Sequence, residues 1–205
     1  LDSTLTIAAN GTLSAPRGTL ELAANFDNSS TIADSDGYYG FSHNSGKVKF
    51  SNTNDADVAI NNTGTVEPVF YNLSNALETT GRLQAEDDIT VINILELCDG
   101  ITTRSTIVGA NAVLTMGNDS QSGYIRSTTA SKPLQTATDS TIQGANVLYP
   151  AIIESSVDLT YIAYYSNCSL KWIDLQQAWT TAGEDRTVTL TGDCEFDAVT
   201  VSSGD

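Results

Sequence analysis

Two aspartates, Asp34 and Asp36, are separated by a single residue and are followed by Gly37. Alternate carboxylates on a turn that contains glycine can converge on one hard cation, so this stretch is a candidate calcium site. It lacks the later bidentate glutamate of a complete calcium loop, and an aspartate followed by glycine is also an ordinary turn sequence. The turn is the simpler interpretation, and calcium is the only cofactor that the residues suggest.

Three aromatic residues follow directly: Tyr38, Tyr39 and Phe41, flanked by glycine and serine. Aromatic rings on an exposed loop can stack on sugars or form part of a protein interface. These three are therefore the candidate ligand or partner contacts. The aromatic residues between positions 149 and 179 are instead expected to be buried and to close the core.

The three cysteines, Cys98, Cys168 and Cys194, are far apart in the chain and form no Cys-x-x-Cys pair. Their number and spacing do not fit a disulfide scaffold or a zinc site. Buried free thiols on strands are the simplest interpretation. A disulfide between Cys168 and Cys194 is the alternative.

The residues give little support to catalysis. His43 is the only histidine, and it is not part of a Gly-x-Ser-x-Gly motif, so a histidine-dependent nucleophile is not expected. Pairs of carboxylates can cleave polysaccharides, and the chain has 25 Asp and Glu residues. No pair among them is marked out by apolar neighbours, so we expect a protein that is not an enzyme.

Charge and composition exclude several classes of partner. With 9 Lys and Arg against 25 Asp and Glu, the 205-residue chain has a formal charge of -16, which repels nucleic acids and anionic membranes. The longest apolar stretch, residues 147–153, is interrupted by Pro150 and is shorter than the roughly 18 to 20 residues of a membrane span. We expect neither a nucleic-acid partner nor a membrane span.

Two short templates recur along the chain, both with apolar residues at every second position, which is typical of half-buried strands. The first, glycine-x-apolar-x-(apolar or small), begins at Gly11, Gly18, Gly46, Gly81 and Gly192. The second, a small or acidic residue before apolar-x-apolar, begins at Thr4, Asp57, Asp88 and Ala198. Strands this short suit a β-sandwich or a β-solenoid. Corners built from Asn, Gly and Ser, such as residues 61–64, favour the solenoid.

The repeats resemble those of right-handed parallel β-helix proteins from phage virions and bacterial surface adhesins. The residues that carry this resemblance are 46–52, 58–60, 69–73, 81–83 and 88–91. It extends over residues 3–115 and returns at 187–205, with departures at Pro68 and at residues 84–87. The implied fold is all-β, a right-handed parallel β-helix or β-solenoid with an irregular C-terminal part, and a β-sandwich is the alternative. The residues expected to point inward are Val48, Phe50, Val58, Ile60, Leu83, Ile89 and Val91.

This pattern divides the chain into three parts. Residues 1–125 are expected to form solenoid turns, residues 126–157 a loop excursion or an irregular turn, and residues 158–205 further turns with a short helix at 173–179. At Val199–Asp205 the template calls for another strand. An open turn would expose unpaired backbone groups, so we expect either further chain beyond residue 205 or a partner that covers this end.

The resemblance implies a structural component of a bacteriophage virion, such as a tail fibre, a spike or a capsid decoration. Such a component would be a rigid rod for assembly or host attachment. The alternative is a segment of a secreted bacterial adhesin or surface protein, located outside the cell or on its surface, and a polysaccharide-degrading enzyme is third. The implied partners are other virion or surface proteins, further copies of the chain in a homotrimer, and a host glycan.

Overall fold

The structure is a computed structural model of residues 1–205. It describes the chain except for residues 34–36, 38–39, 54–55, 79–80, 98–105, 129–132, 149–151, 155–158, 161–162, 166–168, 175–188, 192–194, 197–198 and 201–205.

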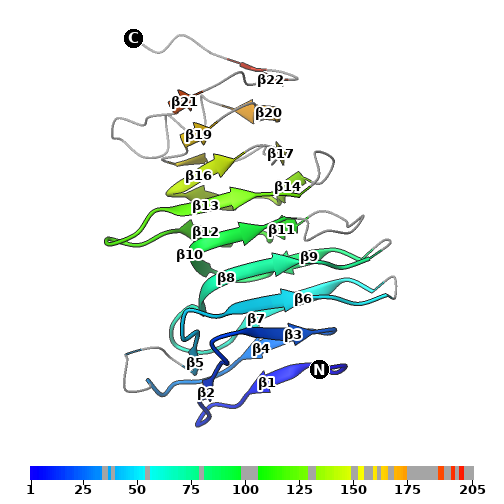
Figure 1. Ribbon diagram of the computed structural model, residues 1–205, viewed down its shortest axis with the longest axis vertical. Coiled ribbons are helices and arrows are strands. Elements are labelled where there is room, and N and C mark those ends of the chain that lie inside the picture. The colour runs from blue at the N-terminus through cyan, green and yellow to red at the C-terminus, as the bar shows by residue number, and fades with distance from the viewer. Residues whose placement is uncertain are drawn as a thin grey trace.

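The chain winds into a parallel β-solenoid, an elongated stack of turns that rises from the N-terminal end to the C-terminal end (Figure 1). Every pairing between its named strands is parallel. A β-sandwich joins antiparallel strands by hairpins, so this pattern excludes the sandwich alternative and confirms the predicted solenoid.

The first side of the solenoid, face A, is one continuous parallel sheet. Its strands are β1 (Leu5–Ile7), β4 (Phe26–Asn28), β7 (Val58–Asn62), β9 (Leu83–Ala85), β11 (Thr106–Val108), β14 (Pro133–Thr136), β17 (Ile152–Glu154), β20 (Ser169–Asp174) and β22 (Glu195–Phe196), and β23 (Val199–Thr200) also pairs with β20.

The other two sides, faces B and C, are joined by two long strands, β8 (Val69–Asn75) and β10 (Ile89–Glu96), which bend from one face to the other. Face B also contains β2 (Leu13–Ser14), β5 (Phe41–Ser42), β12 (Val113–Met116), β15 (Thr141–Gln143) and β18 (Leu159–Thr160). Face C also contains β3 (Thr19–Leu22), β6 (Lys47–Phe50), β13 (Gly123–Arg126), β16 (Ala145–Leu148), β19 (Ala163–Tyr165) and β21 (Thr189–Thr191).

The bend in β10 coincides with a shift of register between Val91 and Ile94, where β10 has one residue more than β8 and the pairing is interrupted. Pro68, expected at an edge or a bulge, lies immediately before β8, and its carbonyl accepts a hydrogen bond from the Thr90 N–H at 3.2 Å. At this position the missing N–H of proline costs no bond inside the ladder.

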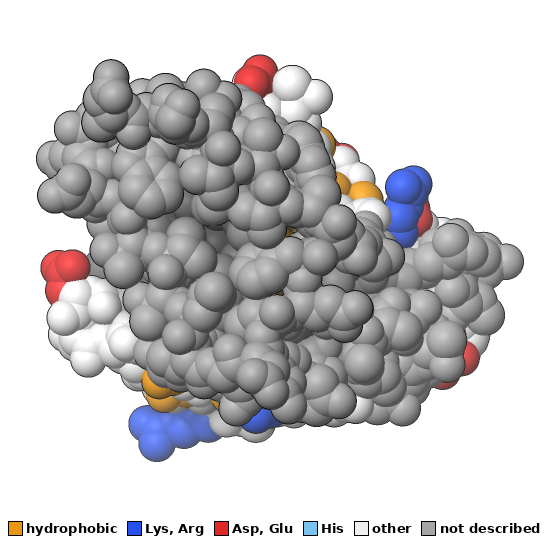
Figure 2. Space-filling view, turned by 90° about the horizontal axis from the view of Figure 1, so that it is seen from above, with side chains coloured by type: hydrophobic (Ala, Val, Ile, Leu, Met, Phe, Trp, Pro, Cys, Tyr) orange, Lys and Arg blue, Asp and Glu red, His pale blue; other side chains and the backbone are white. Residues whose placement is uncertain are grey.

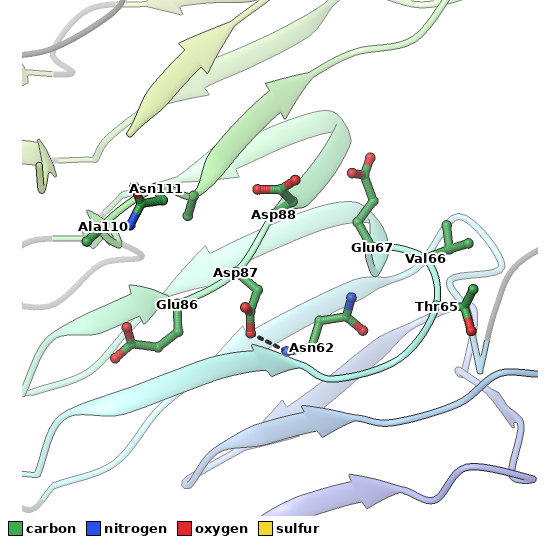
Figure 3. A pocket seen from close by; sticks show the side chains of 10 residues that line it. Asn62, Thr65, Val66, Glu67, Glu86, Asp87, Asp88, Ala110 and Asn111 are labelled. Atoms are coloured by element: carbon green, nitrogen blue, oxygen red, sulfur yellow. Dashed lines mark hydrogen bonds between the residues drawn. The ribbon is translucent and has the colours of Figure 1, made fainter. Parts of the chain in front are cut away.

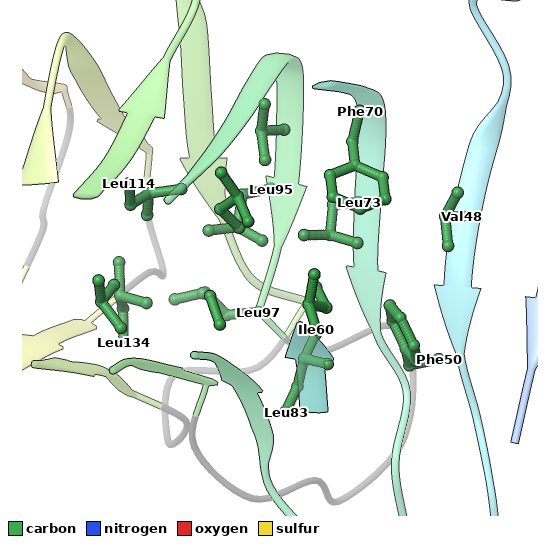
Figure 4. Packing of buried hydrophobic residues seen from close by; sticks show 14 of the residues in the cluster. Val48, Phe50, Ile60, Phe70, Leu73, Leu83, Leu95, Leu97, Leu114 and Leu134 are labelled. Carbon is green, nitrogen blue, oxygen red and sulfur yellow. The ribbon is translucent and has the colours of Figure 1, made fainter. Parts of the chain in front are cut away.

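Apolar side chains from the three faces meet inside the solenoid and form one core (Figure 4). The seven residues predicted to point inward are all buried, with exposed fractions of 3% or less. On face C, Val48, Leu73 and Leu95 occupy matching register positions on successive strands. Each turn therefore packs its inward residues directly on those of the next turn, as the period of two in the sequence requires.

The lower part of the core contains three phenylalanines, Phe26 from face A and Phe41 and Phe70 from face B. The ring centroid of Phe26 lies 5.2 Å from that of Phe41 and 5.4 Å from that of Phe70, both in edge-on geometry. Phe41 was predicted to be an exposed contact residue, and this prediction is wrong, because its side chain is only 1% exposed. It points inward on β5, where burial of a large ring stabilises the first turns.

Asparagine side chains close the corner that follows face A. Asn28 Nδ2 donates to Asn62 Oδ1 at 3.3 Å, one turn away. Each of the two Oδ1 atoms also accepts a backbone N–H two residues further along its own corner, from Ser30 and Gly64. Asparagines of successive turns therefore stack at this corner, and they satisfy backbone donors where the chain leaves the ladder.

Residues 126–157 were expected to form a loop excursion or an irregular turn, and the described part of this segment contains strands instead of a loop. They include β14, β15, β16 and β17, which pair in register with the strands of the preceding turn. The serine, threonine and alanine content of this segment obscured the strands. Each short strand needs only one inward apolar residue, and Leu134, Ile142, Val147 and Ile153 are fully buried.

The short helix expected at residues 173–179 does not begin where the sequence placed it, because Ile173 and Asp174 belong to β20. These two residues pair with Val199 and Thr200 of β23, so the backbone there takes part in a sheet. The rest of that prediction lies outside the described residues. In the described parts of the chain, no helix has the length and apolar character of a membrane span.

The core packing predicts that Phe50→Ala lowers the free energy of unfolding by about 3 to 5 kcal/mol, because it removes a fully buried ring and leaves a cavity. Urea unfolding followed by circular dichroism measures the change. Lys49→Ala, on the outward side of the same strand, is the matched control and should change stability by less than about 0.5 kcal/mol. Equal effects of the two variants would contradict the register described here.

The corner geometry predicts that Asn28→Ala lowers the free energy of unfolding by about 1 to 3 kcal/mol, because the buried Ser30 N–H loses its acceptor. The control is Asn61→Ala, which removes a half-buried side chain that donates to Asp27 Oδ1 at 2.7 Å. In the same measurement, Asn61→Ala should lower the free energy of unfolding by less than Asn28→Ala does, since it leaves no buried backbone N–H without an acceptor. A larger loss for Asn61→Ala would show that the corner ladder is not what stabilises this turn.

Candidate functional site

A groove with a volume of about 500 Å³ lies along the corner between faces A and B (Figure 3). Three successive turns form it. The residues that line it are Asn62, Thr65, Val66, Glu67, Glu86, Asp87, Asp88, Ala110, Asn111 and Ala112. Four carboxylates thus share one concave surface with neutral amides and methyl groups.

Three of the four carboxylates are held by donors of the solenoid itself. Asp87 Oδ2 accepts the Asn62 N–H at 2.7 Å, and Asp88 Oδ1 accepts the Val113 N–H at 2.8 Å. Glu67 Oε1 accepts the Thr90 hydroxyl at 2.7 Å. A bond to a charged acceptor is stronger than one between neutral groups, so these contacts fix the carboxylates in place and tie adjacent turns together.

The aspartate contacts follow a common rule of sequence separation. Asp87 with Asn62 and Asp88 with Val113 are each 25 residues apart, which is one turn of the solenoid in this region. Asp57 repeats the arrangement, because its Oδ1 accepts the Arg82 N–H at 2.9 Å across the same separation. These acidic corners therefore satisfy backbone donors of a neighbouring turn, which gives part of the negative charge a structural role.

The carboxylates of the groove are spread along it and do not point at one centre (Figure 3). Among the residues that the structure describes, no group of three or more His, Cys, Asp or Glu side chains is placed to hold a metal ion. The arrangement can accept hydrogen bonds from hydroxyl or amino groups. It does not bring together an acid and a base that would assign a reaction.

The close approach of turns beneath the groove depends on Gly109. A Cβ atom at this position would lie 2.6 Å from the Ala85 carbonyl oxygen and 3.0 Å from the Glu86 Cα. Both atoms belong to the backbone of the preceding turn, to which the Gly109 N–H donates at 2.7 Å. Only glycine allows the backbone at position 109 to approach the preceding turn this closely, and this approach places residues 110–112 at the groove.

The structure describes few of the residues that the sequence predicted as sites. Asp34 and Asp36, the calcium candidates, and Tyr38 and Tyr39 of the predicted aromatic loop lie outside the described residues. So do the three cysteines, including Cys168 and Cys194 of the candidate disulfide. Phe41 is described and is buried in the core, so it is not a contact residue.

His43 lies in a structural environment beside β5. It is 8% exposed, its Nδ1 accepts the Ser45 N–H at 2.9 Å, and its ring stacks on that of Tyr71 with centroids 5.6 Å apart. The acceptor role of Nδ1 fixes the turn that follows β5. Asn44 and Ser45 in this turn have φ angles of 47° and 58°, which asparagine tolerates better than serine.

The sequence alone did not reveal the groove, because Glu86, Asp87 and Asp88 form an acidic run that is equally typical of a solvated corner. The available signal was the alignment of polar corners at a spacing of one turn: Asn62, then Asp87, then Asn111. That spacing becomes visible only once the register of the turns is known, since the turns differ in length.

Charged side chains of the described residues project around the rim of the solenoid when it is viewed along its long axis (Figure 2). Arg82 and Asp57 form an exposed ion pair at 2.8 Å. The hydrogen bonds that the Arg82 guanidinium donates to Asp57, and the attraction of the Asp57 charge, raise the pKa of Arg82 above its ordinary value. Arginine is already fully charged at neutral pH, so the raised pKa does not change the charge of Arg82 there. The ion pair orders this corner.

No protein-family model, no curated protein and no solved structure matches the chain.

The contacts of Gly109 predict that Gly109→Ala lowers the free energy of unfolding by about 1 to 3 kcal/mol, because the new methyl group meets backbone atoms that cannot move independently. Gly18→Ala is the matched control, since its added Cβ has no atom within 4 Å and its φ is not positive. This variant should be neutral or slightly stabilising, as the loss of glycine restricts the unfolded chain. Thermal unfolding of both proteins measures the difference, and a neutral Gly109→Ala would contradict the packing of this corner.

Proposed function

We propose that this chain is a rigid structural rod that performs no catalysis. In its most specific form, the proposal is that it is a component of a bacteriophage virion, such as a tail fibre, a spike or a capsid decoration. There it would serve in assembly or host attachment. Other virion proteins and further copies of the chain, arranged as a homotrimer, are the proposed partners.

The observation that carries this proposal is the continuity of the parallel ladder. On face A each strand between β1 and β22 is hydrogen-bonded to the strand of the turn below and to that of the turn above. A one-dimensional stack of this kind resists bending, because any bend stretches a row of backbone hydrogen bonds and opens the core. Stiffness along one axis suits a fibre or a spike better than it suits a reaction centre.

The polar side chains support the same interpretation. At the corners, amides and carboxylates are used to join neighbouring turns, as with Asn28 and Asn62 or Asp88 and Val113. These groups strengthen the rod and leave its surface hydrophilic. Carboxylates that accept hydrogen bonds from backbone N–H groups stabilise the fold, which is the role expected of them in a scaffold protein.

A bacterial adhesin or surface protein is the alternative, because the same rod could display a binding tip on a cell. The resemblance of the repeats applies to both classes. The third candidate is a polysaccharide-degrading enzyme, and one observation favours testing it: the corner groove holds four carboxylates, two of which, Glu86 and Asp88, are exposed.

Immunogold electron microscopy tests the proposal. Antibodies against the purified chain should label phage particles at fixed positions, because a structural component is present in every virion. Label on the outer surface of bacterial cells, and not on particles, would favour the adhesin. Label on neither would contradict both forms of the proposal.

The enzymatic alternative has a separate test, in which the purified chain is incubated with a panel of polysaccharides and the release of reducing or unsaturated sugars is measured. We expect no release. Release that is abolished in Glu86→Gln or Asp88→Asn, and retained in the exposed control Asp57→Asn on another corner, would replace the structural proposal with an enzymatic one.

A further inference from the structure

Three amide side chains form a hydrogen-bonded row where face B turns into face C. Asn93 Nδ2 donates to Asn72 Oδ1 at 2.8 Å, and Gln121 Nε2 donates to Asn93 Oδ1 at 2.7 Å. The three residues come from successive turns: Asn72 from β8, Asn93 from β10, and Gln121 from the segment before β13. Each is half-buried, so the row is held in place and still reaches the surface.

The row has hydrogen-bonding capacity beyond its internal contacts. An amide carries two N–H donors and one carbonyl acceptor with two lone pairs, and each bond within the row uses one donor and one lone pair. Because neighbouring amides hold one another, the remaining donors and acceptors have fixed directions. A ligand that binds them does not have to pay the entropy of ordering three flexible side chains.

Beside the amides, face C presents a strip with apolar character. Ile94 and Tyr124 are register partners on β10 and β13, and both are half-buried. They point outward, because Leu95 and Ile125, the next residues on the two strands, are buried in the core. Asn146 follows Tyr124 in register on β16 and donates to the Gly123 carbonyl at 3.0 Å.

These side chains define what we call the amide surface: Asn72, Asn93, Ile94, Gln121, Tyr124 and Asn146. None of them carries a charge at neutral pH, in a chain whose formal charge is -16. The combination of fixed amides with an aromatic ring and an aliphatic side chain matches a ligand that has hydroxyl groups at its edges and C–H groups on its faces.

We propose that the amide surface binds an uncharged polysaccharide that runs along the long axis of the solenoid. Parallel strands repeat at about 4.8 Å, which is close to the length of one sugar residue in an extended glycan chain, so successive sugars meet successive turns. Sugar hydroxyls bond to the amides, and sugar C–H faces pack on Ile94 and Tyr124. Anionic polymers are disfavoured, because the rest of the chain repels them.

The inference rests on the attachment role proposed above and assigns it a ligand class and a surface. The attachment role and the ligand assignment can be contradicted independently of each other. A chain that is found in virions and binds no polysaccharide would keep the structural role and remove only the ligand.

Affinity electrophoresis of the full chain tests the proposal, with dextran, amylose, mannan and a soluble β-glucan in the gel and polygalacturonate as the anionic comparison. We expect at least one neutral polymer to retard the chain more than polygalacturonate does. Retardation by none of the neutral polymers, or equal retardation by the anionic one, would overturn the proposal. Self-association through this surface, seen as a shift to monomer in the Tyr124→Ala variant during sedimentation, would also overturn it in favour of a second copy.

Variants locate the binding surface. Tyr124→Ala and Gln121→Ala should each weaken binding to the retarding polymer by about tenfold or more, whereas Tyr124→Phe should retain most of it because the ring remains. Gln84→Ala, an outward and half-buried glutamine on face A, is the matched control and should bind as the parent does. Circular dichroism establishes that each variant is folded. Equal weakening in Gln84→Ala and Gln121→Ala would place the ligand elsewhere.

Discussion

Parallel pairing in register is the constraint on which the rest of this structure depends. A strand such as β9 is hydrogen-bonded to β7 on one edge and to β11 on the other, so its position is fixed from both sides. Side chains alternate between the core and the surface, and a slip of one residue would bring Gln84 inward and Leu83 outward. The penalty for such a slip would be repeated in every turn above it, which keeps the whole stack in a single register.

Parallel pairing in register also determines the contacts of the polar residues that face the core or lie at the corners. Thr106 occupies an inward position between Leu83 and Leu134, and its hydroxyl accepts a hydrogen bond from Asn75 Nδ2 at 3.0 Å. A polar group is tolerated there because it has a partner, whereas an unpartnered hydroxyl would be costly. At the corners, where the ladder ends, asparagine and aspartate side chains take over the role of the missing backbone partners.

A surface on such a solenoid is assembled from residues that are one turn apart in the chain. The corner groove joins Asn62, Asp87 and Asn111, and the amide surface joins Asn72, Asn93 and Gln121. In both cases similar polar residues recur at matching positions of successive turns, so the surface extends along the axis of the rod. An extended ligand or a long interface suits this geometry better than a compact substrate does, because the concave pocket of an enzyme needs groups that converge.

The sequence by itself determined the architecture and the inward face of each regular strand. The period of two at Val48 and Phe50, or at Ile89 and Val91, allows only one side to be buried, and the asparagine-rich corners favoured stacking over hairpins. It did not determine the role of Phe41, which is as compatible with an exposed loop as with a core position, nor the strands within 126–157, where one apolar residue per strand is too weak a pattern. The groove and the amide surface were decided only by the tertiary structure. Their residues are separated by turns of unequal length, and nothing local in the chain records which residue of one turn lies over which residue of the next.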